Sequence, residues 1–114
     1  MNDGFIVCWP AVIWSDAGGG PIYGRSQRLT SGTIVMEIEH NLPLGMCCTV
    51  MLKLPKSWPD EAGRFIRGRG EVVSSVLTSL NFKIMFKWLE LKGNSEAILN
   101  EQNLKYRETW KRES

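Results

Sequence analysis

The chain has 114 residues, of which 43% are apolar and 23% charged, with a formal net charge of +2. This length suits one domain whose core needs no disulfide or metal support, and the near-neutral charge argues against a general nucleic-acid or anionic-membrane binder. Three cysteines without a CxxC spacing, a single histidine and no long apolar run predict no metal site, no signal peptide and no membrane insertion. We therefore expect a single cytoplasmic domain over residues 1–114 that needs no cofactor.

The first half of the chain reads as strands separated by turns. Residues 5–14 are apolar and rich in β-branched side chains, although Pro10 indicates an edge or a bend. The glycines at 18–20 predict a turn, because glycine adopts positive φ without steric cost, and a second strand then extends over 22–29. Residues 32–40 alternate between apolar and charged side chains, as a half-buried strand does.

The second half repeats this pattern and then changes. Residues 46–55 alternate again, a long stretch follows over 64–76, and 82–88 is the clearest strand. Short strands at regular spacing favour a mainly β fold, a small antiparallel six-stranded barrel that is split or closed. From Asn94 or Ser95 onward, the absence of glycine and proline predicts one C-terminal α-helix over roughly 94–110.

Candidates for chemistry are few. His40 could pair with Cys47 or Cys48 if a hairpin brought their strands together, and an enzyme relying on one of these thiols is the resulting hypothesis. Nothing in the sequence orients such a pair or lowers a thiol pKa, and a solvated turn histidine is the alternative. We therefore predict that the protein is not an enzyme.

Candidates for anion binding are the arginines. The glycines at 18–20 are not followed by the lysine and hydroxyl of a phosphate loop, so a simple turn is the expectation. Arg67 and Arg69 share one strand face and could bind a phosphate bidentately, or could simply be solvated. The segment 24–33 brings Arg25 and Arg28 together with several hydroxyls and two glycines.

The order of these features resembles the PilZ family, small bacterial barrels linked to cyclic di-GMP signalling. Over residues 12–55 the sequence runs through a hairpin, a hydroxyl–glycine turn, an alternating strand, an LPLG turn and a strand ending in LP. Residues 66–91 add a GEVV element and a last strand ending in FKWL. The resemblance covers roughly residues 9–100 and implies a signalling barrel.

Two elements of the family's ligand site differ here. No arginine precedes Arg25, so the Arg-x-x-x-Arg arm before the barrel is missing. The Asp/Asn-x-Ser-x-x-Gly element aligns with QRLTSG, which puts Gln27 first and Leu29 in the serine position; one residue later, Thr30 keeps the hydroxyl but Thr33 replaces the glycine. Each lost charge-assisted hydrogen bond is worth about 1.5–3 kcal/mol, so direct cyclic di-GMP binding is expected to be weak or lost.

The remaining arginines of this segment do not obviously replace the arm. Arg25 and Arg28 are three residues apart, so on a regular strand they point to opposite faces unless a bulge intervenes. If the nucleotide binds at all, the ligand-binding residues are expected to be Arg25, Arg28, Thr30, Ser31, Gly32, Arg67 and Arg69.

The resemblance implies an adaptor that acts through protein contacts, with pilus-assembly proteins of the type IV pilus, or with motility or signalling proteins, as partners. Aromatic side chains dominate interface energetics, so the predicted partner surface is Phe5, Trp9, Trp14 and Trp58, unless these rings lie in the core. One alternative is a genuine cyclic di-GMP receptor with a non-standard arginine site. Another is a small barrel that binds single-stranded nucleic acid along Arg67, Arg69, Lys83 and Lys87.

Overall fold

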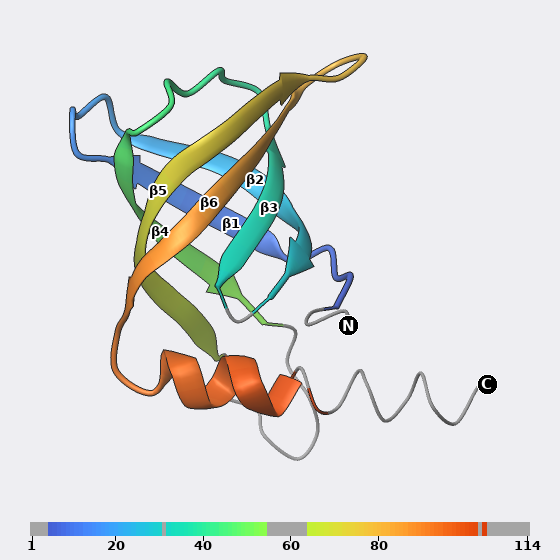
Figure 1. Ribbon diagram of the computed structural model, residues 1–114, viewed down its shortest axis with the longest axis vertical. Coiled ribbons are helices and arrows are strands. Elements are labelled where there is room, and N and C mark those ends of the chain that lie inside the picture. Colours follow the sequence, from blue (N-terminus) through green and yellow to red (C-terminus); the bar gives the residue numbers. More distant parts are fainter. Residues whose placement is uncertain (1–4, 31, 55–63, 103, 105–114) are drawn as a thin grey trace.

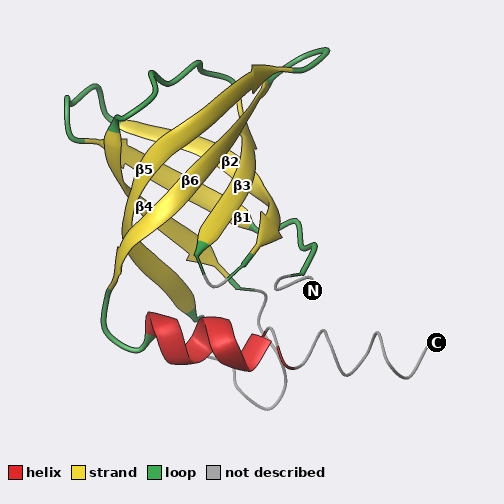
Figure 2. Ribbon diagram, viewed as in Figure 1, coloured by secondary structure: helices red, strands yellow, loops and turns green. Residues whose placement is uncertain are grey.

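The computed structural model describes residues 5–30, 32–54, 64–102 and 104. Six antiparallel strands close into a barrel in the order β1-β2-β3-β6-β5-β4, and β4 pairs back onto β1 (Figure 1). A helix at residues 95–102 covers one mouth of the barrel, so the predicted fold is confirmed (Figure 2). The strands are β1 (Pro10–Ser15), β2 (Pro21–Leu29), β3 (Thr33–Ile38), β4 (Cys47–Lys53), β5 (Phe65–Leu77) and β6 (Phe82–Leu91).

The predicted alternation is confirmed in β3, β4 and β6, whose inward side chains fill the barrel. Met36, Val50 and Phe86 are completely buried examples from these three strands. Small barrels are filled by such side chains and leave no room for a ligand inside. Val35 differs from the expectation, because it points outward and is nevertheless buried, outside the core cluster.

The beginning of the chain departs from the single strand expected over residues 5–14. β1 begins at Pro10, a position where the missing N–H costs the sheet nothing, and Phe5 forms an isolated bridge with Leu29 instead. Pro10 therefore marks the start of a strand in a closed barrel rather than an edge.

Ser26 of β2 forms hydrogen bonds with the segment that precedes β1. Its buried hydroxyl donates to the carbonyl of Val7 at 2.6 Å and accepts from the N–H of Trp9 at 3.0 Å. The backbone N–H of Ser26 donates to the carbonyl of Trp9 at 2.9 Å. These bonds hold the side chains of Val7 and Trp9 in the core.

Glycines allow β5 and β6 to approach closely. A Cβ on Gly68 would lie 2.3 Å from the carbonyl oxygen of Glu90, and one on Gly70 would lie 3.2 Å from the Cβ of Phe86. The register between the two strands shifts at Arg69/Gly70, where the hairpin bends around the barrel. The missing side chains of these two glycines are what allow this close backbone approach.

The helix is attached to the same part of β5. The hydroxyl of Ser95 accepts a hydrogen bond of 2.9 Å from the N–H of Arg67, and Ile98 and Leu99 are buried against the barrel. Arg64 and Glu101 form an ion pair at 2.6 Å. The later part of the predicted helix, residues 103 and 105–110, lies outside the described residues.

Replacing Ser26 with alanine leaves the carbonyl of Val7 and the N–H of Trp9 buried without this partner. We expect Ser26→Ala to lower the free energy of unfolding by about 1–3 kcal/mol, measured by urea denaturation. Ser75→Ala removes an exposed hydrogen bond to Asn41 and is the matched control, with an expected change below about 0.5 kcal/mol. Equal effects of the two substitutions would contradict this role of Ser26.

Candidate functional site

A β-bulge in β2 determines where its polar side chains point. Ser26 pairs with Met36 and Arg28 with Val35, so Gln27 is the extra residue. Ser26 points into the barrel, whereas Gln27 and Arg28 both lie on the outer side, as Arg25 does. From the sequence, Arg25 and Arg28 could share a face only if a bulge intervened. This bulge is present, and both arginines therefore reach the outer surface.

An outer groove of about 700 Å³ lies over β2, β3, β6 and the end of β5; we call it the β2–β6 groove. Arg28 and Lys83 supply positive charge to it, and Val35 lies among its apolar side chains. The described residues that line it are Ile6, Gln27, Arg28, Thr30, Thr33, Val35, Ser74, Val76, Lys83 and Met85. Among the predicted ligand-binding residues that the structure describes, only Arg28 and Thr30 belong to this lining.

Thr30 is engaged in the turn between β2 and β3. Its hydroxyl accepts hydrogen bonds from the N–H groups of Thr33 at 2.8 Å and Gly32 at 3.2 Å, and its own N–H donates to the Thr33 carbonyl at 2.9 Å. The carbonyl of Gly32 accepts from the N–H of Trp88 at 2.9 Å. Ser31 lies outside the described residues. The hydroxyl predicted to contact a ligand thus shapes the hairpin.

Gln27 is bound by its own sheet. Its side-chain amide donates to one carboxylate oxygen of Glu37 at 2.6 Å, and the amide of Asn81 donates to the other oxygen at 2.8 Å. Sequence reasoning missed this network, because Gln27 and Asn81 are far apart in the chain and only the pairing of β3 with β2 and β6 joins them. The network holds a carboxylate close to the groove, which disfavours a phosphate there.

The arginines of β5 do not reach the groove. The guanidinium of Arg69 forms an ion pair with both carboxylate oxygens of Asp16, in the turn after β1, and this hydrogen bonding raises the pKa of Arg69. Arg67 is exposed on β5, opposite Met51 of β4. The predicted ligand set is therefore spread over separate parts of the outer wall.

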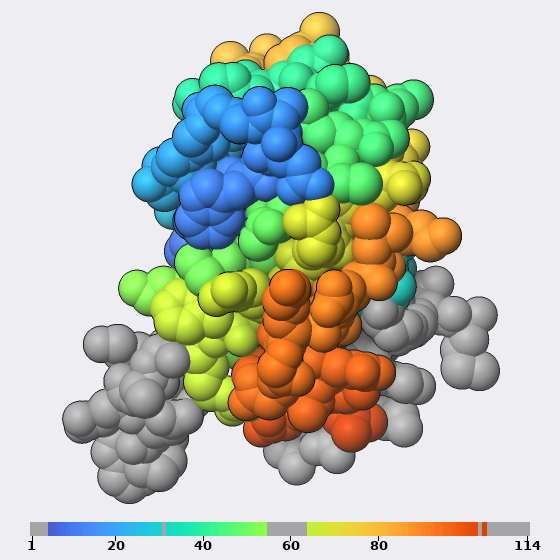
Figure 3. Space-filling view, turned by 90° about the vertical axis from the view of Figure 1, so that its left-hand side faces the viewer, coloured from blue at the N-terminus to red at the C-terminus, as the bar shows by residue number. Residues whose placement is uncertain are grey.

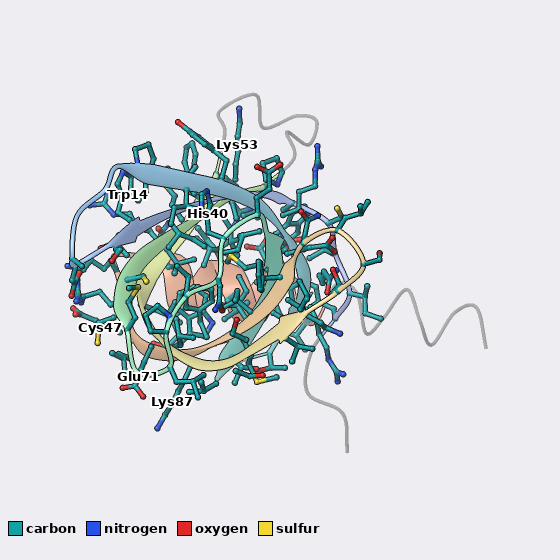
Figure 4. The ribbon with its side chains drawn as sticks, turned by 90° about the horizontal axis from the view of Figure 1, so that it is seen from above. Trp14, His40, Cys47, Lys53, Glu71 and Lys87 are labelled. Atoms are coloured by element: carbon teal, nitrogen blue, oxygen red, sulfur yellow. The ribbon has the colours of Figure 1, made fainter. Side chains whose placement is uncertain are left out.

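The cations predicted to bind single-stranded nucleic acid do not form a continuous positive row either, because carboxylates lie opposite the two lysines. On β6, Lys83 lies opposite Glu37 and Lys87 lies opposite Glu71. Figure 4 shows Glu71 and Lys87 projecting together from one side of the barrel. Alternating charges do not provide the continuous positive groove that a single strand needs.

The aromatic residues predicted as a partner surface divide into two groups. Phe5 and Trp9 are buried and meet edge to face, with ring centroids 5.8 Å apart, so they belong to the core, and their assignment to the surface is corrected. Trp14 on β1 is 37% exposed. Trp58 lies outside the described residues.

The hypothetical thiol–histidine pair does not form. β3 and β4 are not neighbours in the barrel, because the connection between them crosses the mouth, so the expected hairpin is wrong. Figure 4 shows His40 and Cys47 on different parts of the rim. Burial, followed by the charge of Asp16, raises the pKa of Cys48 to about 11, which keeps this thiol protonated at neutral pH.

Alkylation tests the state of Cys48. With iodoacetamide at neutral pH, we expect the exposed Cys8 to react readily and the buried Cys48 to stay unmodified, as measured by peptide mass spectrometry. The unfolded thiol has an ordinary pKa of 9.0, so Cys48 stabilises the fold below that pH and this contribution is lost as the pH rises through about 11. Rapid labelling of Cys48 at neutral pH would contradict the assignment.

No protein-family model and no curated protein matches the sequence. Among solved structures, the inhibitor of motility MotI/DgrA of Bacillus subtilis superimposes with a TM-score of 0.79 at 14% identity, over 94% of this chain. The chain spans 50% of the length of that protein. The PilZ domain of CeSA from a cellulose-synthesizing bacterium superimposes with a TM-score of 0.63 at 10% identity, over 93% of this chain and 99% of that domain. The fold of this chain is therefore that of a PilZ domain.

Proposed function

We propose that the protein is a non-catalytic PilZ-type adaptor in cyclic di-GMP-linked signalling, acting mainly through protein contacts. The observation that carries this proposal is the β5–β6 hairpin, which projects beyond the barrel (Figure 1). Val76, Leu77 and Leu80 of this hairpin are 54%, 70% and 89% exposed. Large apolar side chains gathered at an exposed end are typical of protein-binding surfaces.

The β2–β6 groove supports the proposal that cyclic di-GMP binding is weak or lost. Arg28 brings one guanidinium to the groove, and Lys83 adds an ammonium group, which cannot grip a phosphate bidentately. Gln27 is held by Glu37, and the hydroxyl of Thr30 is engaged in its turn. A tightly bound dinucleotide would need several more charge-assisted hydrogen bonds than these side chains supply.

The kind of partner is inferred from the fold. MotI/DgrA is an inhibitor of motility, and it superimposes on nearly the whole of this chain. We propose that the adaptor acts in the cytoplasm, with motility components as its partners by analogy with MotI/DgrA, or with type IV pilus-assembly components as the family resemblance implies. In the described part of the chain, no helix has the length and apolar character needed to span a membrane.

The bulge at Gln27 favours one second candidate, a cyclic di-GMP receptor with a non-standard arginine site. Without the bulge Arg28 would point into the barrel, whereas with it the side chain lines, together with Lys83, a groove large enough for a nucleotide. Arg25 reaches the outer surface as well, although it does not line this groove.

Calorimetric titration with cyclic di-GMP separates the two candidates. For the adaptor we expect no binding in the micromolar range, because one guanidinium replaces the several charge-assisted contacts of a full site. Micromolar binding that disappears in Arg28→Ala and persists in Lys87→Ala would instead establish the receptor.

The hairpin surface is tested by removing its apolar side chains. We expect Leu77→Ser/Leu80→Ser to abolish cross-linking to partner proteins in a host lysate while changing the free energy of unfolding by less than about 0.5 kcal/mol per site. Leu44→Ser is the matched control, since Leu44 is similarly exposed but lies in the connection between β3 and β4. Unchanged cross-linking of the double variant would refute this surface.

A further inference from the structure

A second cavity lies on the outer face of β1, between β2 and β4, and shares no lining residue with the β2–β6 groove. Its volume is about 480 Å³. We call it the β1 groove and define it by six of its lining residues: Val12, Tyr23, Arg25, Met51, Lys53 and Phe65. Figure 3 shows β1, β4 and β5 side by side on this face of the molecule.

Strand pairing arranges these side chains in two rows. Val12 of β1 lies opposite Tyr23 of β2 on one side and Met51 of β4 on the other, which gives an apolar floor with an aromatic ring at its end. The neighbouring row carries Arg25 opposite Pro10, and Lys53 opposite Phe65. Cations and apolar side chains therefore alternate across the groove at the spacing of adjacent strands.

The two cations of the groove are not neutralised within the described residues. Arg25 and Lys53 are exposed and form no ion pair there, whereas Arg69 on the same side of the barrel is paired with Asp16. No carboxylate belongs to the part of the lining that the structure describes. Glu37, which lies opposite Arg25 on β3, is bound instead by two side-chain amides.

The aromatic side chains of the groove have no part in the core. Tyr23 is 69% exposed and Phe65 is 42% exposed, and neither packs against the core cluster. Trp14 follows Val12 on the same outer face of β1, and Figure 4 shows it on the same side of the barrel as Lys53. Aromatic side chains, methionine and arginine are the residue types enriched at the centres of protein interfaces.

We propose that the β1 groove binds an acidic segment of a partner protein. Carboxylates of the segment pair with Arg25 and Lys53, and one apolar or aromatic side chain inserts between Tyr23 and Phe65 over the floor of Val12. Charge complementarity commits the groove to an acidic occupant, because the charged residues in the described part of its lining, Arg25 and Lys53, are both cations.

A protein segment suits the groove better than a nucleic acid. Arg67, opposite Met51, adds one further cation beside the groove, but the positive charge is bounded by the Arg69–Asp16 ion pair, and the protein as a whole carries a net charge of only +2. A nucleic acid would need cations repeated along its phosphates. The inference deepens the proposed adaptor function and rests on it only in taking the partner to be a protein; its site is separate from the β5–β6 hairpin.

Fluorescence anisotropy with a defined probe tests the groove. The probe is a fluorescein-labelled synthetic peptide of glutamates flanking one phenylalanine, and a lysine peptide of the same design serves as the reference. We expect the acidic peptide to bind the intact protein, and Arg25→Ala/Lys53→Ala to weaken it at least about tenfold, which corresponds to about 1.4 kcal/mol. Tyr23→Ser should weaken binding of the acidic peptide as well, because the phenylalanine of the peptide loses its contact with the Tyr23 ring.

Matched variants make the outcome specific. Lys83→Ala/Lys87→Ala removes the same number of cations from another side of the barrel, and Leu77→Ser/Leu80→Ser removes the hairpin surface; both are expected to bind the peptide normally. If Leu77→Ser/Leu80→Ser still cross-links to partner proteins, this result contradicts the adaptor proposal and leaves the inference about the groove unaffected. The inference about the groove is overturned if the acidic peptide does not bind, or binds Arg25→Ala/Lys53→Ala equally well. It is also overturned if oligodeoxythymidylate binds more tightly than the peptide and is lost in that same variant.

Discussion

Closure of the barrel by the pairing of β4 with β1 is the constraint on which the remaining structure depends. It gathers the inward side chains of six strands into one core cluster. The polar side chains of the same strands lie on the outer wall, where a ligand or partner can reach them. The two grooves and the projecting hairpin are all features of that wall.

Several polar side chains of the outer wall form hydrogen bonds or ion pairs with other groups of the protein. Gln27 and Asn81 donate to Glu37, Thr30 closes a turn, and Arg69 is paired with Asp16. Each of these side chains could serve a bound anion if it were free. These groups are engaged within the protein, whereas the cations in the described lining of the grooves are Arg28 with Lys83 in one and Arg25 with Lys53 in the other.

The strands were predictable from the sequence because their alternation is a local signal. Ile34, Met36 and Ile38 face inward as their spacing required, and the glycines at 18–20 adopt positive φ in the turn.

The pairing of strands is not local. That β3 pairs with β6 rather than β4 separates His40 from Cys47, and no residue in their vicinity signals it. The bulge at Gln27 likewise depends on the register of β2 against β3, which a single strand does not encode. The position of Trp9 depends on hydrogen bonds with Ser26, and that of Phe5 on its bridge to Leu29, and neither contact has a local sequence signal.

The β5–β6 hairpin also leaves a strand edge open. β4 pairs with β5 only as far as Glu71, and no strand among the described residues lies along the other side of positions 74–77. Main-chain donors and acceptors of this edge therefore lie beside the exposed apolar side chains of Val76 and Leu77. Edges of this kind template the addition of a further strand. At high protein concentration, self-association should therefore begin at this hairpin, and a charged residue placed there would keep the protein monomeric.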